Sequence, residues 1–431
     1  MNTVYITGHQ NPDIDSVCSA LAYAELKNLT DGDTLYKAVR CGHLSGNTKT
    51  ILSSLGIMPP PYMKDVYPKV GDVILTSDEN FDADDKLSEL AKSFSRSNPS
   101  VTPIFKDGRF YGLVSVDNIA SAYMHLLSGD ESYSDPLIRD VMREEGEPID
   151  SSMRFEEAKE KLGAFKTRGL AVFEGEEYVG YVTRRCFLNS PRYKVILVDH
   201  NEPEQSIKGL DSADIVEIID HHRLDAPKTK LPIFIDSEPL GSTCTIVYQL
   251  YLRNGIRPDY DTAKAMLAGI IADTIILKSP TTTKIDIDSA KVLAKIVGVD
   301  YEEFGKQMFS CIERLKNREP ESAIASDFKM YNEHGTKFGI GQAEVMTLAD
   351  LDDYKDKYLD ALKQIRDKNG LEWAVFMITD VLKEDSVLLT TDFRANQHLQ
   401  YQQLSSNTYD LPGVMSRKKQ LLPDIIHSLS V

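Results

Sequence analysis

The sequence predicts an α/β protein with a mostly parallel sheet, and two observations carry this prediction. Short apolar runs typical of buried strands alternate with longer segments whose apolar residues recur at helical spacing. Clusters of His and Asp follow the ends of those runs, which is where ligands bind in open parallel sheets. Because 431 residues are too many for one hydrophobic core, we expect two or three domains.

The first strand and helix are predicted at the start of the chain. The run "TVYIT" (3–7) is typical of a buried strand, and "SVCSALAYAELKNL" (16–29) is typical of a helix. Two further strands are predicted at "YKVILVDH" (193–200) and "ADIVEIIDHH" (213–222), and a helix at "TAKAMLAGIIADTIIL" (262–277). This alternation favours parallel strands covered by helices.

The middle of the chain contains an internal duplication. At an offset of 68 residues, Phe105 aligns with Phe173, and "GLVS" (112–115) aligns with "GYVT" (180–183). Each copy predicts a helix, two short strands joined by a turn, and a second helix. Two copies packed together bury apolar surface that one copy leaves exposed. We therefore expect residues 66–190 to form an inserted module.

Charge and composition narrow the function classes. Lys plus Arg number 49 against 66 Asp plus Glu, and the resulting charge of -17 disfavours a nucleic-acid or membrane partner. The start of the sequence has no basic segment followed by an apolar one, and no run approaches the roughly 20 apolar residues of a membrane span, so we expect a cytoplasmic protein. The five cysteines form no CxxC pair, which disfavours disulfides and a zinc-thiolate site.

His and Asp side chains follow several of the predicted elements at one edge of the sheet. His9, Asp13 and Asp15 follow the first strand, Asp199 ends the next, Asp220-His221-His222 ends another, and Asp273 lies in the apolar helical run. Their nitrogen and oxygen donors suit Mn²⁺ or Co²⁺, and six side chains suit two ions that share a carboxylate. Two ions about 3.5–4 Å apart can bind one water between them, lower its pKa and stabilise in-line displacement at phosphorus. The pattern therefore predicts phosphoryl hydrolysis.

Each cluster also has a purely structural interpretation. Asp15 or Ser16 can cap the following helix, and Asp273 can accept hydrogen bonds from a helix N-terminus. The "DHH" run (220–222) is also typical of polar residues at the end of a strand. The metal interpretation is favoured because four independent elements present such residues at the same edge.

A basic run stands near the end of this acidic chain. In "GVMSRKKQLLPDI" (413–425), Arg417, Lys418 and Lys419 are consecutive and are flanked by apolar residues. A charge run is usually solvated, but Arg can bind phosphate with two parallel hydrogen bonds and Lys adds a compact charge. We predict that this segment binds an anion.

Six motifs in order closely resemble the family II inorganic pyrophosphatases of the DHH phosphoesterase superfamily. These motifs are "GHQNPDIDS", "LVDHNE", "IDHH", "GSTCTIV", "ADTIILKSPTTT" and "SRKKQ". The inserted duplication resembles a CBS-domain pair. The resemblance implies a parallel-sheet DHH catalytic domain, a regulatory CBS pair, a linker and an α/β DHHA2-type substrate-binding domain. The catalytic domain is expected at 1–65 and 191–312, and the CBS pair at 66–190. The linker is expected at 313–326 and the DHHA2-type domain at 327–431.

The resemblance implies an inorganic pyrophosphatase, dependent on manganese or cobalt, that hydrolyses diphosphate to two phosphates by a metal-bridged water. It also implies Mg²⁺ with the substrate, a homodimer, and regulation by AMP, ADP or ATP at the CBS pair. One ion would be held by His9, Asp13 and Asp199, and the other by Asp15, Asp199, His221 and Asp273. The substrate would be contacted by His222, Lys329, Arg417 and Lys418, with His222 as a donor and general acid.

The nucleotide motif departs from the common CBS pattern G-x-h-T-x-x-D. The first copy has Ser115 and Asn118 at the Thr and Asp positions, and the second has Thr183 but Cys186. We expect nucleotide contacts chiefly from Ser115 and Asn118, with Thr183 and Arg184 as further candidates, Arg184 facing either a phosphate or solvent.

Two alternatives come from other classes. Another DHH phosphoesterase would act on oligonucleotides, cyclic dinucleotides or polyphosphate, but such relatives generally carry a glycine-rich GGGH-type motif that this sequence lacks. A nucleotide sensor with a decayed hydrolase is disfavoured because all six ligand residues are present.

Overall fold

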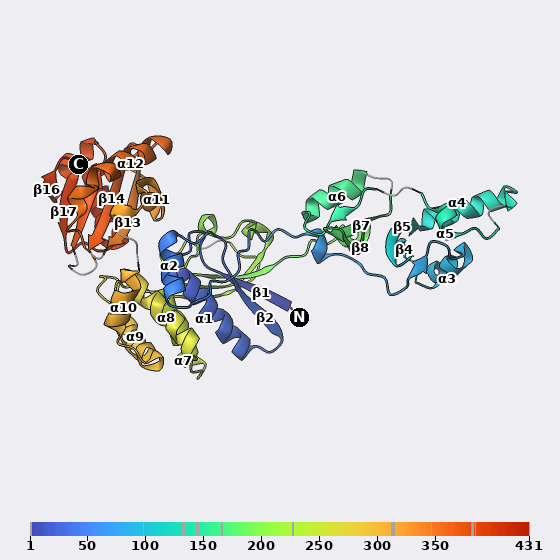
Figure 1. Ribbon diagram of the computed structural model, residues 1–431, viewed down its shortest axis with the longest axis horizontal. Helices are drawn as coiled ribbons and strands as arrows, with labels where there is room; N and C mark the ends of the chain where they lie inside the picture. The colour runs from blue at the N-terminus through green and yellow to red at the C-terminus, as the bar shows by residue number, and fades with distance from the viewer. Residues whose placement is uncertain are drawn as a thin grey trace. The chain divides into compact units, whose positions relative to one another are not determined.

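The computed structural model (Figure 1) describes residues 2–97, 99–131, 134–143, 146–164, 167–225, 228–311, 315–345, 347–380, 383 and 385–430. The chain divides into two compact units, Met1–Asp65 with Lys194–Val431, and Val66–Tyr193. Within the described residues, the helices include none that is both long and apolar enough to cross a membrane.

The first unit contains a five-stranded parallel sheet, which confirms the predicted fold class. In sheet order its strands are β11 (Phe234–Ser237), β10 (Asp214–Asp220), β9 (Lys194–Val198), β1 (Asn2–Thr7) and β2 (Thr34–Val39). The chain leaves β1 toward β2 on one side, whereas β9, β10 and β11 follow on the other side. The switch point between β1 and β9 is where open parallel sheets bind ligands, beyond the carboxyl ends of the strands.

Helices of the same unit pack together around one hydrophobic core. They are α1 (Ile14–Thr30), α2 (Gly46–Ser54), α7 (Thr243–Arg253), α8 (Tyr260–Asp273), α9 (Lys284–Val297) and α10 (Tyr301–Ser310). Helices α1, α7 and α8 lie side by side (Figure 1). Fully buried Ile6 and Ile196 of the sheet share a core with Tyr251 and Leu267 of the helices, so the sheet and the helix ends are held as one body.

Helix α8 ends at Asp273, four residues before the predicted end at Leu277. The residues that follow, Ile275, Ile276 and Leu277, have φ angles of 50°, 56° and 63°. This left-handed conformation is unfavourable for aliphatic side chains and is held by tertiary structure. The Ile276 N–H donates to the carbonyl of Ile271 at 2.9 Å. The apolar pattern continues through the turn, so periodicity overestimated the helix.

The C-terminal part of the same unit is a six-stranded mixed sheet with helices on both faces. Its strands, in sheet order, are β12 (Phe328–Glu333), β13 (Thr336–Val345), β14 (Trp373–Asp380), β15 (Asp385–Thr390), β17 (Thr408–Pro412) and β16 (Gln402–Ser405). Alternate residues of β14 face opposite sides: Phe376 packs with α12 (Lys355–Lys368), and Val375 packs with α13 (Leu422–Ser430).

The expected linker at 313–326 is partly structured. Residues 313 and 314 lie outside the described residues, but Pro320–Ala325 forms helix α11. Ile324 of this helix is fully buried with Phe376 in the C-terminal core. The position of the domain boundary stays a prediction.

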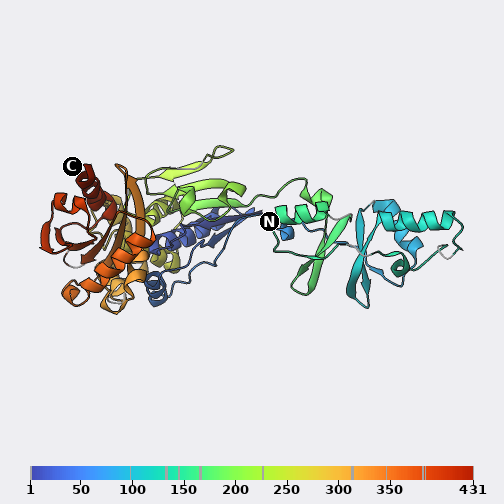
Figure 2. The ribbon, with the colours of Figure 1, turned by 90° about the horizontal axis from the view of Figure 1, so that it is seen from above.

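The second unit contains two copies of one small α/β fold. The first copy has β3 (Phe81–Asp82), α3 (Leu87–Ser97), β4 (Val101–Lys106), β5 (Arg109–Ser115), α4 (Val116–Leu127) and α5 (Ile138–Val141). The second has β6 (Ile149–Asp150), α6 (Phe155–Ala164), β7 (Gly169–Glu174) and β8 (Glu177–Thr183). The hairpins 101–115 and 169–183 lie side by side, cyan and green in Figure 2. Phe110 and Tyr178, equivalent at the 68-residue offset, stack with ring centroids 4.2 Å apart.

The second copy lacks the closing helix that we predicted. Only a four-residue 3-10 turn, η3 (Arg184–Phe187), follows β8. Pro191 comes four residues after this turn, and β9 begins at Lys194. The chain therefore has too few residues for a full helix before it returns to the parallel sheet.

Candidate metal centre

The structure brings the six predicted metal ligands together at the switch point of the parallel sheet. They come from the segment after β1, from the ends of β9 and β10, and from the last residue of α8. The two predicted ligand groups have donor atoms within 4.8 Å of one another: His9, Asp13 and Asp199, and Asp15, Asp199, His221 and Asp273. A further group of this kind consists of Asp199, His221 and His222. Asp199 belongs to both predicted ligand groups and to the further one.

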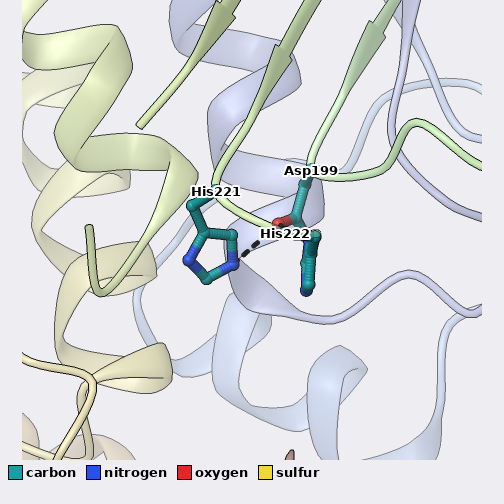
Figure 3. Close-up of side chains that lie close together, drawn as sticks. All are labelled: Asp199, His221 and His222. Atoms are coloured by element: carbon teal, nitrogen blue, oxygen red, sulfur yellow. Dashed lines mark ion pairs between the residues drawn. The ribbon is translucent and has the colours of Figure 1, made fainter. Parts of the chain in front are cut away.

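Asp199 divides its two oxygens between the groups. Its Oδ2 lies 3.4 Å from Nε2 of His9, and its Oδ1 lies 3.5 Å from Nε2 of His221. Figure 3 shows Asp199 and His221 pointing toward each other, with His222 beside them. The φ angle of Asp199 is 59°, an unfavourable conformation for a residue other than Gly. Strain of this kind is tolerated mainly at functional sites, where it aims a side chain.

The distances within each group match those between ligands of one ion. Nε2 of His9 lies 3.3 Å from Oδ2 of Asp13, and Nε2 of His221 lies 3.5 Å from Oδ2 of Asp273. Donor atoms placed ~2.1 Å from a common ion are roughly 3–3.5 Å apart. Nε2 of His221 is also buried without a hydrogen-bond partner among the described residues. These donors therefore fit a divalent cation.

The electrostatics of the site favour added positive charge. Burial, together with the charges of Asp15 and Asp13, raises the pKa of Asp199 well above its usual value. The same three causes raise the pKa of Asp273. Burial alone would lower the pKa of His9, but Asp13 and Asp199 raise it to about 10. A nitrogen and oxygen donor set with excess negative charge suits Mn²⁺ or Co²⁺.

One predicted structural role falls on a different residue. The N-cap of α1 is Asp13, whose Oδ1 accepts a hydrogen bond from the Ser16 N–H at 2.9 Å. Asp13 thus caps the helix with one oxygen and faces His9 with the other. The alternative interpretation, in which Asp15 or Ser16 is the cap, was wrong, because the helix begins at Ile14.

Asp15, rather than Asp273, accepts hydrogen bonds from a helix N-terminus. Its Oδ2 accepts from the N–H of Thr243 at 2.7 Å. Its Oδ1 accepts from the hydroxyl of Ser242 at 2.7 Å and from the N–H of Cys244 at 3.0 Å. These donors begin helix α7, in the motif "GSTCTIV", to which the sequence assigned no role.

His222 is oriented by a residue that sequence reasoning missed. Its Nδ1 lies 2.8 Å from Oδ1 of Asp220, and Asp220 is fully buried. The other oxygen of Asp220 accepts a hydrogen bond from the side-chain amide of Asn201. Because Nδ1 is engaged, Nε2 is the ring nitrogen left for a substrate. Asp220 opens the "DHH" motif, so the signal lay in the sequence.

The predicted anion-binding residues lie in the C-terminal part of the unit. Lys329 is on β12, and Arg417 and Lys418 begin a π-helix, η9 (Arg417–Leu421). Insertions of this type are frequent at functional sites. Arg417 is 6% exposed and donates from Nη1 to the backbone carbonyl and Oδ1 of Asp327, at 2.8 and 2.9 Å.

Lys418, unlike Arg417, is exposed to solvent. Nearby protein atoms partly desolvate its ammonium group. This desolvation, together with the charges of Lys329 and Arg417, lowers the pKa of Lys418 to about 8. Burial and the charges of Lys418 and Lys329 lower the pKa of His222, although Asp220 opposes them. The positive field of these lysines therefore reaches the metal centre.

The predicted nucleotide contacts are engaged in local structure. Ser115 donates from its N–H and hydroxyl to Oδ1 of Asn118, at 2.8 and 2.6 Å, and both residues are buried. In the second copy, the N–H of Thr183 lies 3.3 Å from Sγ of Cys186. Arg184 is exposed. A nucleotide role for these residues stays a prediction.

Comparison with known proteins places the chain in a family. The model of the DHH family, N-terminal domain, matches residues 3–270, and the model of the DHHA2 domain matches residues 306–427. A cobalt-dependent inorganic pyrophosphatase of Clostridium perfringens is 28% identical over 549 aligned positions, covering 98% of each chain. A manganese-dependent inorganic pyrophosphatase of Methanothrix thermoacetophila is 38% identical over 236 residues, covering 54% of this chain and 76% of its own.

The fold also matches a crystal structure from Methanococcus jannaschii of a protein assigned to the family II inorganic pyrophosphatases. The two share 24% identity with a TM-score of 0.61, and the match covers 99% of this chain and 100% of the other. The family model spans more than half of the chain, a DHHA2 domain follows it, and relatives match over the full length. The chain therefore belongs to the DHH family, within its family II inorganic pyrophosphatases.

Proposed function

We propose that the protein hydrolyses diphosphate to two phosphates and depends on Mn²⁺ or Co²⁺. The observation that carries this proposal is the sharing of Asp199 between two groups of nitrogen and oxygen donors. The named cobalt and manganese dependence of the two relatives supports the choice of metal.

The proposed roles divide the side chains by their geometry. His9, Asp13 and Asp199 hold one ion, and Asp15, Asp199, His221 and Asp273 hold the second. When bound, such a pair of ions supplies Lewis-acid stabilisation and a water of lowered pKa. His222 faces the reaction with Nε2, because Asp220 engages Nδ1, and donates a hydrogen bond or proton to the leaving phosphate.

We propose that Lys418, Lys329 and Arg417 bind the phosphates of the substrate. Lys418 is the exposed cation of the three, whereas Arg417 is engaged by Asp327. Arg417 therefore contributes by exchanging or sharing its contact with Asp327 when an anion binds. Mg²⁺ accompanying the substrate, a homodimer and a cytoplasmic location complete the proposal. The first two rest on the family resemblance alone, and the location rests on the sequence pattern.

We also propose that residues 66–190 regulate the enzyme by binding AMP, ADP or ATP. In the sequence, this segment separates α2 from β9, so it interrupts the part of the chain that forms the metal centre. A ligand acts there only to the extent that it binds the active and inactive arrangements with different affinity. Because Ser115 and Asn118 bond each other, contact with a ribose would require them to exchange those hydrogen bonds.

Phosphate release from diphosphate tests the proposed reaction. The full-length protein is freed of metal with a chelator and assayed with Mn²⁺, Co²⁺ or Mg²⁺ alone, and then with each nucleotide. We expect that, with Mn²⁺ or Co²⁺, the protein hydrolyses diphosphate far faster than a dinucleotide, a cyclic dinucleotide or polyphosphate. Comparable rates on these substrates would instead favour another DHH phosphoesterase.

A further inference from the structure

The segment Leu240–Thr245 contacts three of the four side chains in the group that contains Asp273. The carbonyl of Leu240 lies 3.0 Å from Nδ1 of His221, which leaves Nε2 of that ring facing the group. The hydroxyl of Thr243 donates to Oδ1 of Asp199 at 3.0 Å. The N-terminus of α7, in the same segment, donates three hydrogen bonds to Asp15. The position of this segment therefore sets the positions of several proposed ligands at once.

Asp286 holds the segment through hydrogen bonds to residues that are not proposed ligands. Its Oδ2 accepts from the N–H of Gly241 at 2.9 Å, and its Oδ1 accepts from the hydroxyl of Thr245 at 2.6 Å. Asp286 is fully buried. A single carboxylate thus ties both ends of a short segment to the start of α9.

The fit between Asp286 and the segment is close. A Cβ atom on Gly241 would lie 3.0 Å from Oδ2 of Asp286 and 2.7 Å from Cγ2 of Thr274. Thr274 follows Asp273, the fourth side chain of the group. A larger residue at position 241 would therefore displace Asp286, the residues around Thr274, or both.

Capping of α9 does not by itself account for Asp286. The residue does complete a capping box, because it accepts from the N–H and hydroxyl of Thr283, both at 2.7 Å. Capping alone does not require a buried carboxylate, since the exposed Asp300 caps α10 with the same kind of hydrogen bond. Burying a carboxylate is costly unless hydrogen bonds compensate it, and here the compensation comes from a second element, α7, and the residues before it.

We propose that Asp286 is a positioning residue that sets the metal affinity of the Asp15, Asp199, His221 and Asp273 group. It acts through Gly241 and Thr245, and its hydrogen bonds within the described part of the chain go to none of the proposed ligands. This inference rests on the proposed function, because it assumes that the group binds a divalent cation. Residues that orient metal ligands typically change metal affinity about 10- to 100-fold when they are replaced.

Calorimetric titration of the metal-free full-length protein with Mn²⁺ tests the proposal. In Asp286→Asn, the affinity of one of two binding steps should fall about 10- to 100-fold, while the other step stays unchanged. Thr245→Val, which keeps the shape but removes the hydroxyl, should weaken the same step less. Thr245→Ser restores the hydroxyl and should restore the affinity. Asp273→Ala removes a ligand of this group alone and identifies its binding step.

Asp380→Asn is the matched control. Asp380 is also fully buried, and it accepts from the backbone N–H groups of Leu348 and Lys383 at 3.2 and 2.9 Å, in the C-terminal sheet domain. This variant should lower the melting temperature and leave both affinities unchanged. If Asp286→Asn fails to fold, the pair Thr245→Val and Thr245→Ser decides the question.

The possible results separate the two claims. Wild-type affinities at both steps in Asp286→Asn and Thr245→Val, or an equal loss at both steps, would overturn the positioning role alone. A wild-type protein that binds no Mn²⁺ and releases no phosphate from diphosphate would overturn the proposed function, and this inference with it.

Discussion

The metal centre and the repeat module both contain polar residues that sequence motifs single out, but their side chains are in different states. At the metal centre, Nε2 of His221 is buried without a hydrogen-bond partner among the described residues, and carboxylates crowd around it. In the repeat module, Ser115 and Asn118 satisfy each other as the cap of α4. A motif locates polar side chains, whereas unsatisfied buried atoms indicate that a ligand is needed.

The largest expected effect comes from Asp199, the carboxylate shared by both groups. Asp199→Ala should remove bound Mn²⁺ and diphosphate hydrolysis together, because both groups lose a donor. Asp199→Asn should impair both, since the shared charge is lost. Metal content and turnover are measured on the same samples, and full activity with two bound ions in Asp199→Ala would contradict the two-metal assignment.

The next largest effect is expected at Lys418. Lys418→Ala should lower kcat/KM for diphosphate about 10²–10³-fold, because charge-assisted contacts that stabilise a transition state are worth about 3–4 kcal/mol. Lys419→Ala is the control, since Lys419 is the neighbouring exposed cation of the same turn. Equal losses in the two variants would show a general field effect in place of a specific contact.

Arg417 provides a sharper comparison within the same turn. Arg417→Ala should also lower kcat/KM, and it should lower the melting temperature as well, because Arg417 is buried and bonded to Asp327. Lys418→Ala should leave the melting temperature nearly unchanged. A thermal melt recorded beside the kinetics distinguishes the structural part of the Arg417 effect from its contribution to substrate binding.

A smaller effect is expected from Asp220, which orients His222. Asp220→Asn should lower kcat about 10- to 100-fold with little change in KM, because a hydrogen bond to a charged group is worth about 1.5–3 kcal/mol. Metal content should stay at the wild-type level. Loss of bound metal in this variant would instead assign Asp220 to the support of His221.

The smallest effect on diphosphate turnover is expected from removal of the repeat module. Replacement of residues 66–190 by a short linker should leave a working enzyme that no longer responds to AMP or ATP. Calorimetry and phosphate release are compared between the intact and shortened proteins. Absence of nucleotide binding by the intact protein, or an equal response in both, would remove the regulatory proposal while leaving the proposed reaction in place.

Sequence patterns alone located much of the fold and the candidate site. The predicted strands at 3–7, 193–200 and 213–222 all lie in the parallel sheet, because buried strands are marked by local apolar runs. The positions of His9 and Asp199 just after strands were readable for the same reason. Patterns failed where local signals were ambiguous: the apolar residues after Asp273 continue a helical pattern but adopt a left-handed turn.

Tertiary structure decided which polar groups meet. The hydroxyl of Ser242 and the carboxylate of Asp15 are separated by 227 positions in the chain, and Asp286 reaches Gly241 across 45. The spacing of apolar and polar residues along the sequence does not predict such pairs, because they form only when the strands and helices are packed. Amino-acid sequence therefore determined the donors that this protein presents at the sheet edge. Packing decided their partners, since a buried carboxylate must be satisfied by whichever backbone and hydroxyl groups the fold brings within hydrogen-bond distance.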